Sequence, residues 1–157
     1  MQNSLENKHL ATIRTLHGAP EGQDARLLAA RAREIMPEDR VLLHVALDDT
    51  RVAILQELLE FFAPDVQVLT FPAWDCLPYD RVSPNAGIVA ARVAALAGLS
   101  RWQRQKERFP RILLTTVNAV VQRVMPRAAL ENAALSVEAG KPLDLAHLQN
   151  FLSQNGY

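Results

Sequence analysis

The sequence predicts an α/β protein in which helices flank a parallel sheet. Short apolar segments of strand length alternate along the chain with longer segments in which apolar residues recur every three or four positions. The links between them are short and often carry proline or glycine, a pattern typical of successive strand–helix–strand units. A chain of 157 residues is long enough for one such domain and a fragment of another.

The first predicted elements follow a polar N-terminus. Residues 1–10 are expected to be disordered, and Ala11–Leu16 to form a short strand. A helix is expected over Asp24–Met36, because Leu28, Ala32 and Ile35 lie on one face and Pro37 stops the helix.

The next strand and helix have clearer patterns. Val41–Leu47 is almost continuously apolar, which is typical of a strand covered on both faces. Asp48, Asp49 and Thr50 can cap a helix that runs to Phe62. We expect that helix to bury Leu55, Leu58, Leu59 and Phe62, and a third strand to follow over Val66–Phe71.

The segment from Phe71 to Gly87 is expected to be a rigid loop laid against the end of a strand. Its prolines rule out a helix or a central strand, and they are Pro72, Pro78 and Pro84. Trp74 and Tyr79 can bury their rings there while the indole N–H or phenol O–H finds a partner. The alternative is a loop that only covers one edge of the sheet.

Two further helices and one strand complete the predicted domain. A helix capped by Ser83 or Asn85 is expected to reach Leu99, with Val89, Val93 and Leu96 inward. After a charged connection, Ile112–Thr116 is expected to be a strand. A helix capped by Thr116 or Asn118 then runs to Pro126 and buries a helical stripe of four valines, namely Val117, Val120, Val121 and Val124.

The pattern changes beyond Pro126. We expect a short strand over Leu135–Glu138, a turn, and a helix from Asp144 to Asn155. The apolar residues of this last helix are Leu145, Leu148, Phe151 and Leu152.

The loop carries a motif that resembles a known family. The chain reads WDCLPYDRVSPNAGIVAARVAAL, which is similar to W-[DE]-x-L-P-Y-[DE]-x-x-S-P followed by a helix with an internal arginine. The matching residues are Trp74, Asp75, Leu77, Pro78, Tyr79, Asp80, Ser83, Pro84 and Arg92. A second match is LLTTVNAVVQRVMP, from Leu113 to Pro126. From about Thr12 to Tyr157 the chain resembles the N-terminal module of the bacterial transcription-repair coupling factor.

The resemblance implies a domain division and a role. Residues 11–127 would form a first domain like that of the excision-repair protein UvrB, and residues 128–157 the beginning of a truncated second domain. The whole protein would be an ATP-driven DNA translocase that displaces stalled RNA polymerase and recruits UvrA for nucleotide excision repair. UvrA would dock mainly on the second domain, and polymerase and DNA on other parts. The last helix would pack on the first domain or, by self-association, on a second copy.

The place of a nucleotide-binding P-loop is occupied by a sequence that lacks its key residues. Such a loop reads G-x-x-x-x-G-K-[ST], and its lysine neutralises the phosphates. When Gly18 is aligned with the first glycine of this pattern, Gly22 falls on a variable position. Gln23 then stands at the position of the second glycine, Asp24 at that of the lysine and Ala25 at that of the hydroxyl residue. The carboxylates of Glu21 and Asp24 would repel a triphosphate. We therefore expect a degenerate P-loop and no cofactor, against the alternative of an active UvrB-type ATP-binding domain acting on DNA.

Other candidate sites are weaker. Asp48 and Asp49 resemble an acidic pair that holds magnesium, but helix capping explains both, and no metal site is expected. Cys76, or the pair Asp75 and Asp80, would serve a small α/β enzyme; we expect instead a packed cysteine and no catalytic residue in this chain.

One basic cluster leaves two interpretations open. Arg101–Arg111 carries five basic residues with Trp102 and Phe109 between them, so it could hold a phosphate backbone with ring stacking, or be a solvated connection. We favour the solvated connection. The whole chain balances 17 basic against 17 acidic residues, which argues against a dedicated DNA-binding domain.

The expected location is the cytoplasm. The chain has a single cysteine, so no internal disulfide can form, which fits a reducing compartment. The N-terminus has no long apolar run of the kind found in signal peptides or membrane spans.

Overall fold

A computed structural model describes residues 15–76, 83–127, 129–130, 135, 137 and 139–154. The predicted strand over residues 11–16 lies almost entirely outside these ranges, and its described end, Thr15 and Leu16, is exposed and belongs to no strand. Tyr79 and Asp80 also lie outside them.

The described strands form one parallel sheet, as the sequence predicts. They are β1 (Leu42–Ala46), β2 (Gln67–Phe71) and β3 (Arg111–Thr116), in the order β1-β3-β2. Leu42 is paired with Ile112 and Gln67 with Arg111, both in parallel register. The α/β class and the parallel sheet are therefore confirmed.

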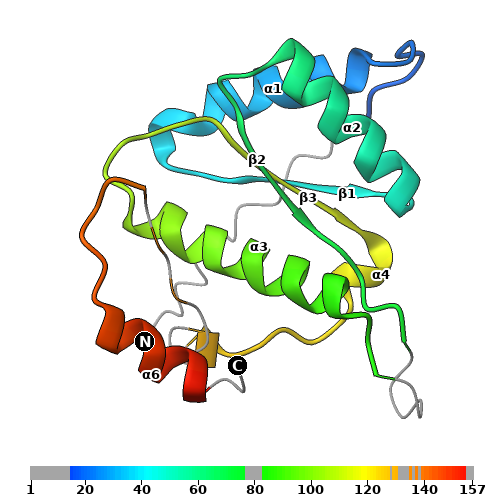
Figure 1. Ribbon diagram of the computed structural model, residues 1–157. Coiled ribbons are helices and arrows are strands. Elements are labelled where there is room, and N and C mark those ends of the chain that lie inside the picture. Colours follow the sequence, from blue (N-terminus) through cyan, green and yellow to red (C-terminus); the bar gives the residue numbers. More distant parts are fainter. Residues whose placement is uncertain are drawn as a thin grey trace, which may run out of the picture.

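Helices cover the two faces of the sheet (Figure 1). Helices α1 (Gln23–Ile35) and α2 (Asp49–Phe62) lie together on one side, and α3 (Ala86–Arg104) lies on the other. Side chains of β3 alternate accordingly: Ile112 and Leu114 pack towards α1 and α2, whereas Leu113 packs with Phe71 and Ala95 on the α3 side.

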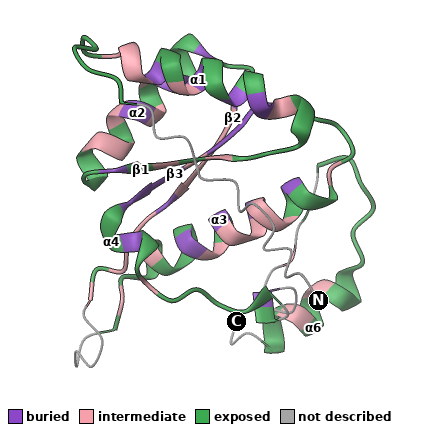
Figure 2. Cartoon of the chain, turned by 180° about the vertical axis from the view of Figure 1, so that it is seen from behind, coloured by how far each residue is buried: buried purple, intermediate pink, exposed green. Residues whose placement is uncertain are grey.

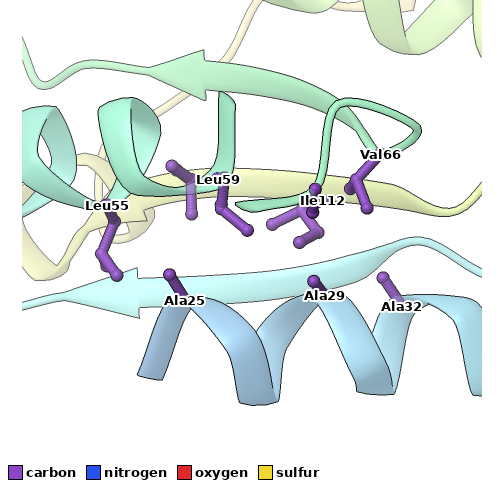
Figure 3. Packing of buried hydrophobic residues seen from close by; sticks show 9 residues of the cluster. Ala25, Ala29, Ala32, Leu55, Leu59, Val66 and Ile112 are labelled. Carbon is purple, nitrogen blue, oxygen red and sulfur yellow. The ribbon is translucent and has the colours of Figure 1, made fainter. Parts of the chain in front are cut away.

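The main core lies between the sheet and the first two helices (Figure 3). Ala25, Ala29 and Ala32 form one buried stripe on α1, and they face Leu55 and Leu59 of α2. Small side chains on α1 let its backbone approach the sheet closely. The buried face of α2 is narrower than the sequence predicts, because Leu58 is only half-buried and Phe62 is 47% exposed.

Helix α3 buries a different face from the expected one. Its buried residues are Arg92, Ala95, Gly98 and Trp102, while Val89 is 37% exposed and Val93 and Leu96 are half-buried. A Cβ at position 98 would meet the end of the Leu69 side chain at 2.8 Å, so a larger residue where α3 crosses β2 would require that side chain to shift. The helix also runs past Leu99 to Arg104, into part of the expected charged connection.

The predicted valine helix is wrong. Helix α4 spans only Val117–Val120, and it begins where the Thr116 hydroxyl accepts a hydrogen bond from the Ala119 N–H at 3.4 Å. Ala119 is its buried residue, and all four valines of the expected stripe are more than half exposed. A helical stripe is buried only where another element covers it, and no described element covers this one.

The expectation for β1 is also wrong in part. Leu42, His44 and Ala46 lie on the face towards α1 and α2, whereas Leu43 and Val45 on the other face are exposed. Figure 2 shows exposed residues along β1. Strand β1 lies at one edge of the sheet, and α3 contacts β2 at the opposite edge. The outer face of β1 is therefore left open among the described residues.

The C-terminal part contains the expected last helix. Helix α6 spans Leu145–Gln154, and the Asp144 carboxylate accepts hydrogen bonds from the Ala146 and His147 N–H groups at 2.9 and 3.1 Å. Of the expected strand over 135–138, Leu135 and Val137 are described and lie in no strand. No helix in the described part of the chain is both long and apolar enough to cross a bilayer.

Candidate functional site

The segment from Gly18 to Ala25, expected from its spacing to be a degenerate P-loop, leads into the N-terminus of α1. Gly18 and Gly22 both have positive φ, at 70° and 81°, which favours glycine. Gly22 is the N-cap of α1, and the Gln23 N–H donates to the Pro20 carbonyl at 3.0 Å. The segment thus keeps two glycines and a helix N-terminus, the features by which a loop of this kind can face an anion.

Asp24 places a carboxylate at that helix N-terminus, where a P-loop has its lysine. Its Oδ1 accepts a hydrogen bond from the Ala25 N–H at 3.0 Å, and its Oδ2 pairs with the Arg51 guanidinium of α2. Both side chains of this pair are about one-third exposed. Ala25, at the hydroxyl position, is fully buried in the core. A negative group already paired within the protein therefore stands at the N-terminus of α1.

His44 of β1 lies close to this ion pair. Burial lowers the pKa of His44, the Arg51 charge lowers it further, and Asp24 acts in the opposite direction. The imidazole is therefore neutral at pH 7 and adds no cation that could hold a phosphate.

A shallow cavity of about 370 Å³ opens beside the same helix N-terminus. Its apolar wall is formed by α2 residues Ile54, Leu58 and Phe62, and its polar rim by Glu21 and Arg26. The opposite charges on the rim and the apolar wall do not form a phosphate cradle.

The acidic residues after β1 serve as a helix cap. The Asp48 Oδ1 accepts a hydrogen bond from the Arg51 N–H at 2.8 Å, and Asp49 is the first residue of α2. No group of three or more His, Cys, Asp or Glu side chains suited to a metal ion occurs among the residues that the structure describes. Further along, Cys76 is a half-buried free thiol, and Asp75 accepts a hydrogen bond from the Asn85 N–H at 3.2 Å.

Arg92 is the most constrained charged residue near the proline-rich loop. It is 3% exposed, and its guanidinium carbon lies 4.2 Å from the Phe71 ring centroid and 4.3 Å from that of Trp74. Its Nη1 donates to the Pro72 carbonyl at 2.6 Å and to Gln122 Oε1 at 3.2 Å. Burial lowers the pKa of this guanidinium.

The Arg92 node, meaning Arg92 with Phe71, Pro72, Trp74 and Gln122, joins three parts of the fold. Gln122 Oε1 also accepts a hydrogen bond from the Trp74 N–H at 2.8 Å. The node therefore ties the end of β2 and the start of the loop to α3 and to the chain after α4. Trp74 is half-buried rather than part of the core. Arg92 is part of the motif, but the motif alone predicts no role for it. The signal for this contact in the sequence is the pair of aromatic residues Phe71 and Trp74, three positions apart.

The basic cluster Arg101–Arg111, which begins in the last turn of α3, is partly structural. Trp102 and Arg111 are each 3% exposed, and the guanidinium carbon of Arg111 lies 5.9 Å from the Trp102 ring centroid. Arg111 also donates to Asp39 Oδ1 at 3.0 Å and to the Glu107 carbonyl at 3.1 Å. A buried tryptophan cannot stack on a base, so the geometry favours a connection over a phosphate grip.

The comparisons with known proteins all lead to one group. A transcription-repair-coupling factor of Myxococcus xanthus is 36% identical over 124 residues, which are 74% of this chain. Similar proteins with the same description occur in Escherichia coli K12, with 33% identity over 59% of this chain, and in Haemophilus influenzae, with 28% over 79%. The chain spans about a tenth or less of the length of these relatives, at 10%, 8% and 10%. No family model and no solved structure matches the chain.

Proposed function

This chain is related in sequence to transcription-repair-coupling factors, and we propose that it is a non-catalytic docking region of such a factor. In this proposal residues 11–127 are a first, UvrB-like domain, and residues 128–157 begin a second. The whole protein would use ATP to move on DNA, displace stalled RNA polymerase and recruit UvrA. Motor activity and polymerase binding would reside outside these residues.

One observation carries the non-catalytic assignment. The Asp24 carboxylate stands where a P-loop has its lysine, and it is paired with Arg51 rather than open to a cation such as magnesium. The fold, a parallel sheet with helices on both faces, is the framework on which P-loop sites are built. We therefore interpret this domain as one that keeps a P-loop architecture without its nucleotide site.

We expect the chain to bind no ATP. A triphosphate placed at the α1 N-terminus would approach the carboxylates of Glu21 and Asp24, and the guanidinium of Arg51 is already paired. Titration calorimetry with ATP and magnesium should give no heat above dilution, in a sample whose cooperative unfolding shows that it is folded. A competent P-loop protein in the same buffer is the positive control. Micromolar affinity would support the alternative, an active ATP-binding domain.

We expect UvrA to bind this chain weakly or not at all, and to bind a longer chain that continues through the whole second domain. The reason is that residues 128–157 supply only the beginning of the domain on which we place the docking surface. Surface plasmon resonance with immobilised UvrA would compare the two chains at matched concentrations. Equal affinities would instead place the docking surface on residues 11–127 and contradict this division of roles.

A further inference from the structure

Three buried polar atoms belong to residues at the corner where α3 ends and strands β2 and β3 begin. They are Gln67 Oε1, Gln105 Oε1 and Arg111 Nε, and each lacks a hydrogen-bond partner among the residues that the structure describes. Buried polar groups are nearly always hydrogen-bonded, and an unpaired one lowers stability. Three such atoms at one corner indicate a partner that the described chain does not supply.

The strand pairing places two of these residues side by side. Gln67 and Arg111 are paired in the parallel register of β2 and β3, and the Gln67 N–H donates to the Pro110 carbonyl at 2.9 Å. Paired residues of adjacent strands lie on the same face of a sheet, and neighbouring residues lie on opposite faces. Because Ile112 packs towards α1 and α2, Gln67 and Arg111 lie on the face towards α3.

The third residue follows α3 at the same corner. Gln105 is the C-cap of α3, three residues after Trp102 and two before Glu107. The Arg111 guanidinium carbon lies 5.9 Å from the Trp102 ring centroid, and Arg111 Nη2 donates to the Glu107 carbonyl at 3.1 Å. Gln105 therefore lies in the chain between two residues that both contact the Arg111 guanidinium.

The three atoms are complementary to one water molecule. Arg111 is 3% exposed and donates to Asp39 and Glu107 through Nη1 and Nη2, so the Nε–H is a further donor, whereas the two glutamine oxygens are acceptors. An anion could accept from the Nε–H, but the two carbonyl oxygens would repel it. An ammonium ion could donate to both oxygens, but it has no lone pair for the N–H. We propose that a single buried water accepts a hydrogen bond from Arg111 Nε and donates one to each of Gln67 Oε1 and Gln105 Oε1. This water would tie the end of α3 to the first residues of both strands.

A crystal structure of the chain, at a resolution that shows ordered solvent, tests the site directly. We expect one water within about 3.2 Å of Arg111 Nε and of both glutamine oxygens. A direct hydrogen bond between Nε and either oxygen would overturn the proposal, and so would an ion at this corner or an Nε that is open to bulk solvent.

A double-substitution cycle tests whether one water links the two glutamines in solution. Methionine has nearly the length of glutamine but no carbonyl oxygen, so Gln67→Met and Gln105→Met each remove one acceptor. We expect each variant to raise the equilibrium constant of unfolding, measured with urea, roughly fivefold, because the remaining polar atoms lose a partner. Both substitutions together should raise it far less than the product of the two effects, since the first already weakens the binding of the water.

Gln103→Met is the matched control, because Gln103 is an exposed residue of α3, and it should change the same constant by no more than about twofold. Circular dichroism of all the variants should show the same helix content as the parent chain. If the effects of Gln67→Met and Gln105→Met simply multiply, the two oxygens do not share a water and the proposal is wrong. It is equally wrong if neither single variant differs from the control.

Discussion

Replacing Arg92 by alanine is expected to lower the free energy of unfolding by about 3 kcal/mol, since hydrogen bonds to charged groups contribute roughly 1.5–3 kcal/mol each. The change removes donors from the Pro72 and Arg123 carbonyls and from Gln122. It also leaves a space between the rings of Phe71 and Trp74, which now lie against the guanidinium. Urea unfolding followed by circular dichroism would measure the loss.

Two variants separate this effect from a general loss of charge on α3. Arg101→Ala removes an exposed arginine from the same helix, and it should change the free energy of unfolding by less than about 0.5 kcal/mol. Arg92→Lys keeps the cation but not the planar fork that donates to several acceptors, so it should recover only part of the loss. If Arg92→Ala were no more destabilising than Arg101→Ala, the node would not contribute to the stability of the fold.

The Trp74 ring allows the node to be tested from its other side. A buried core tryptophan would cost about 3–5 kcal/mol on truncation, but Trp74 is half-buried, so a loss of about 1–2 kcal/mol is expected. Its effect should not add to that of Arg92→Ala, because the two side chains are in contact. A double-mutant cycle should give a coupling of roughly 0.5–2 kcal/mol.

The strands of the fold are largely predictable from the sequence, because each is a short apolar segment bounded by turn residues. Predicted strands at 41–47, 66–71 and 112–116 correspond to β1, β2 and β3 within one residue at each end. Local signals also locate the caps at Asp48, Thr116 and Asp144, since a cap depends on a side chain and a backbone N–H only two or three residues away.

The sequence does not predict which faces of the strands and helices are covered by other elements. The sequence of β1 is typical of a central strand, yet among the described strands it lies at an edge of the sheet. Strand order depends on contacts between segments far apart in the chain. The valines after Thr116 have helical spacing, but no described element covers them. On α3, burial follows the position of β2, so Gly98 and Arg92 are inside while Val89 is not.

In the candidate site too, positions along the chain are predictable from the sequence, whereas contacts between distant segments are not. Spacing from Gly18 places Asp24 at the lysine position of the P-loop pattern, because that comparison uses only positions along the chain. Its partner Arg51 lies 27 residues further on, and no sequence pattern connects the two residues. Likewise, the contact of Arg92 with Trp74 and Gln122 exists only because α3 and the chain after α4 meet at the end of β2.

A second large loss of stability is expected from a substitution in α2. Replacing Leu59 by alanine is expected to lower the free energy of unfolding by about 3–4 kcal/mol, within the range for truncating a buried leucine. Leu59 is fully buried, and it belongs to the cluster that packs α1 and α2 on the sheet (Figure 3). The neighbouring α1 residues are alanines, which have no longer side chains to move into the space. Urea unfolding of the variant at the same protein concentration as the parent would give the value.

Phe62→Ala is the matched control, because the sequence pattern places Phe62 on the same buried stripe as Leu59 whereas the structure leaves it 47% exposed. Its ring lies edge-to-face with that of Phe61, which is 78% exposed, so little apolar surface is lost from the core. We therefore expect a loss below about 1 kcal/mol, although phenylalanine is larger than leucine. Equal losses for the two variants would mean that α2 is rotated about its axis and packs on the sheet with the wider stripe that the sequence alone predicts.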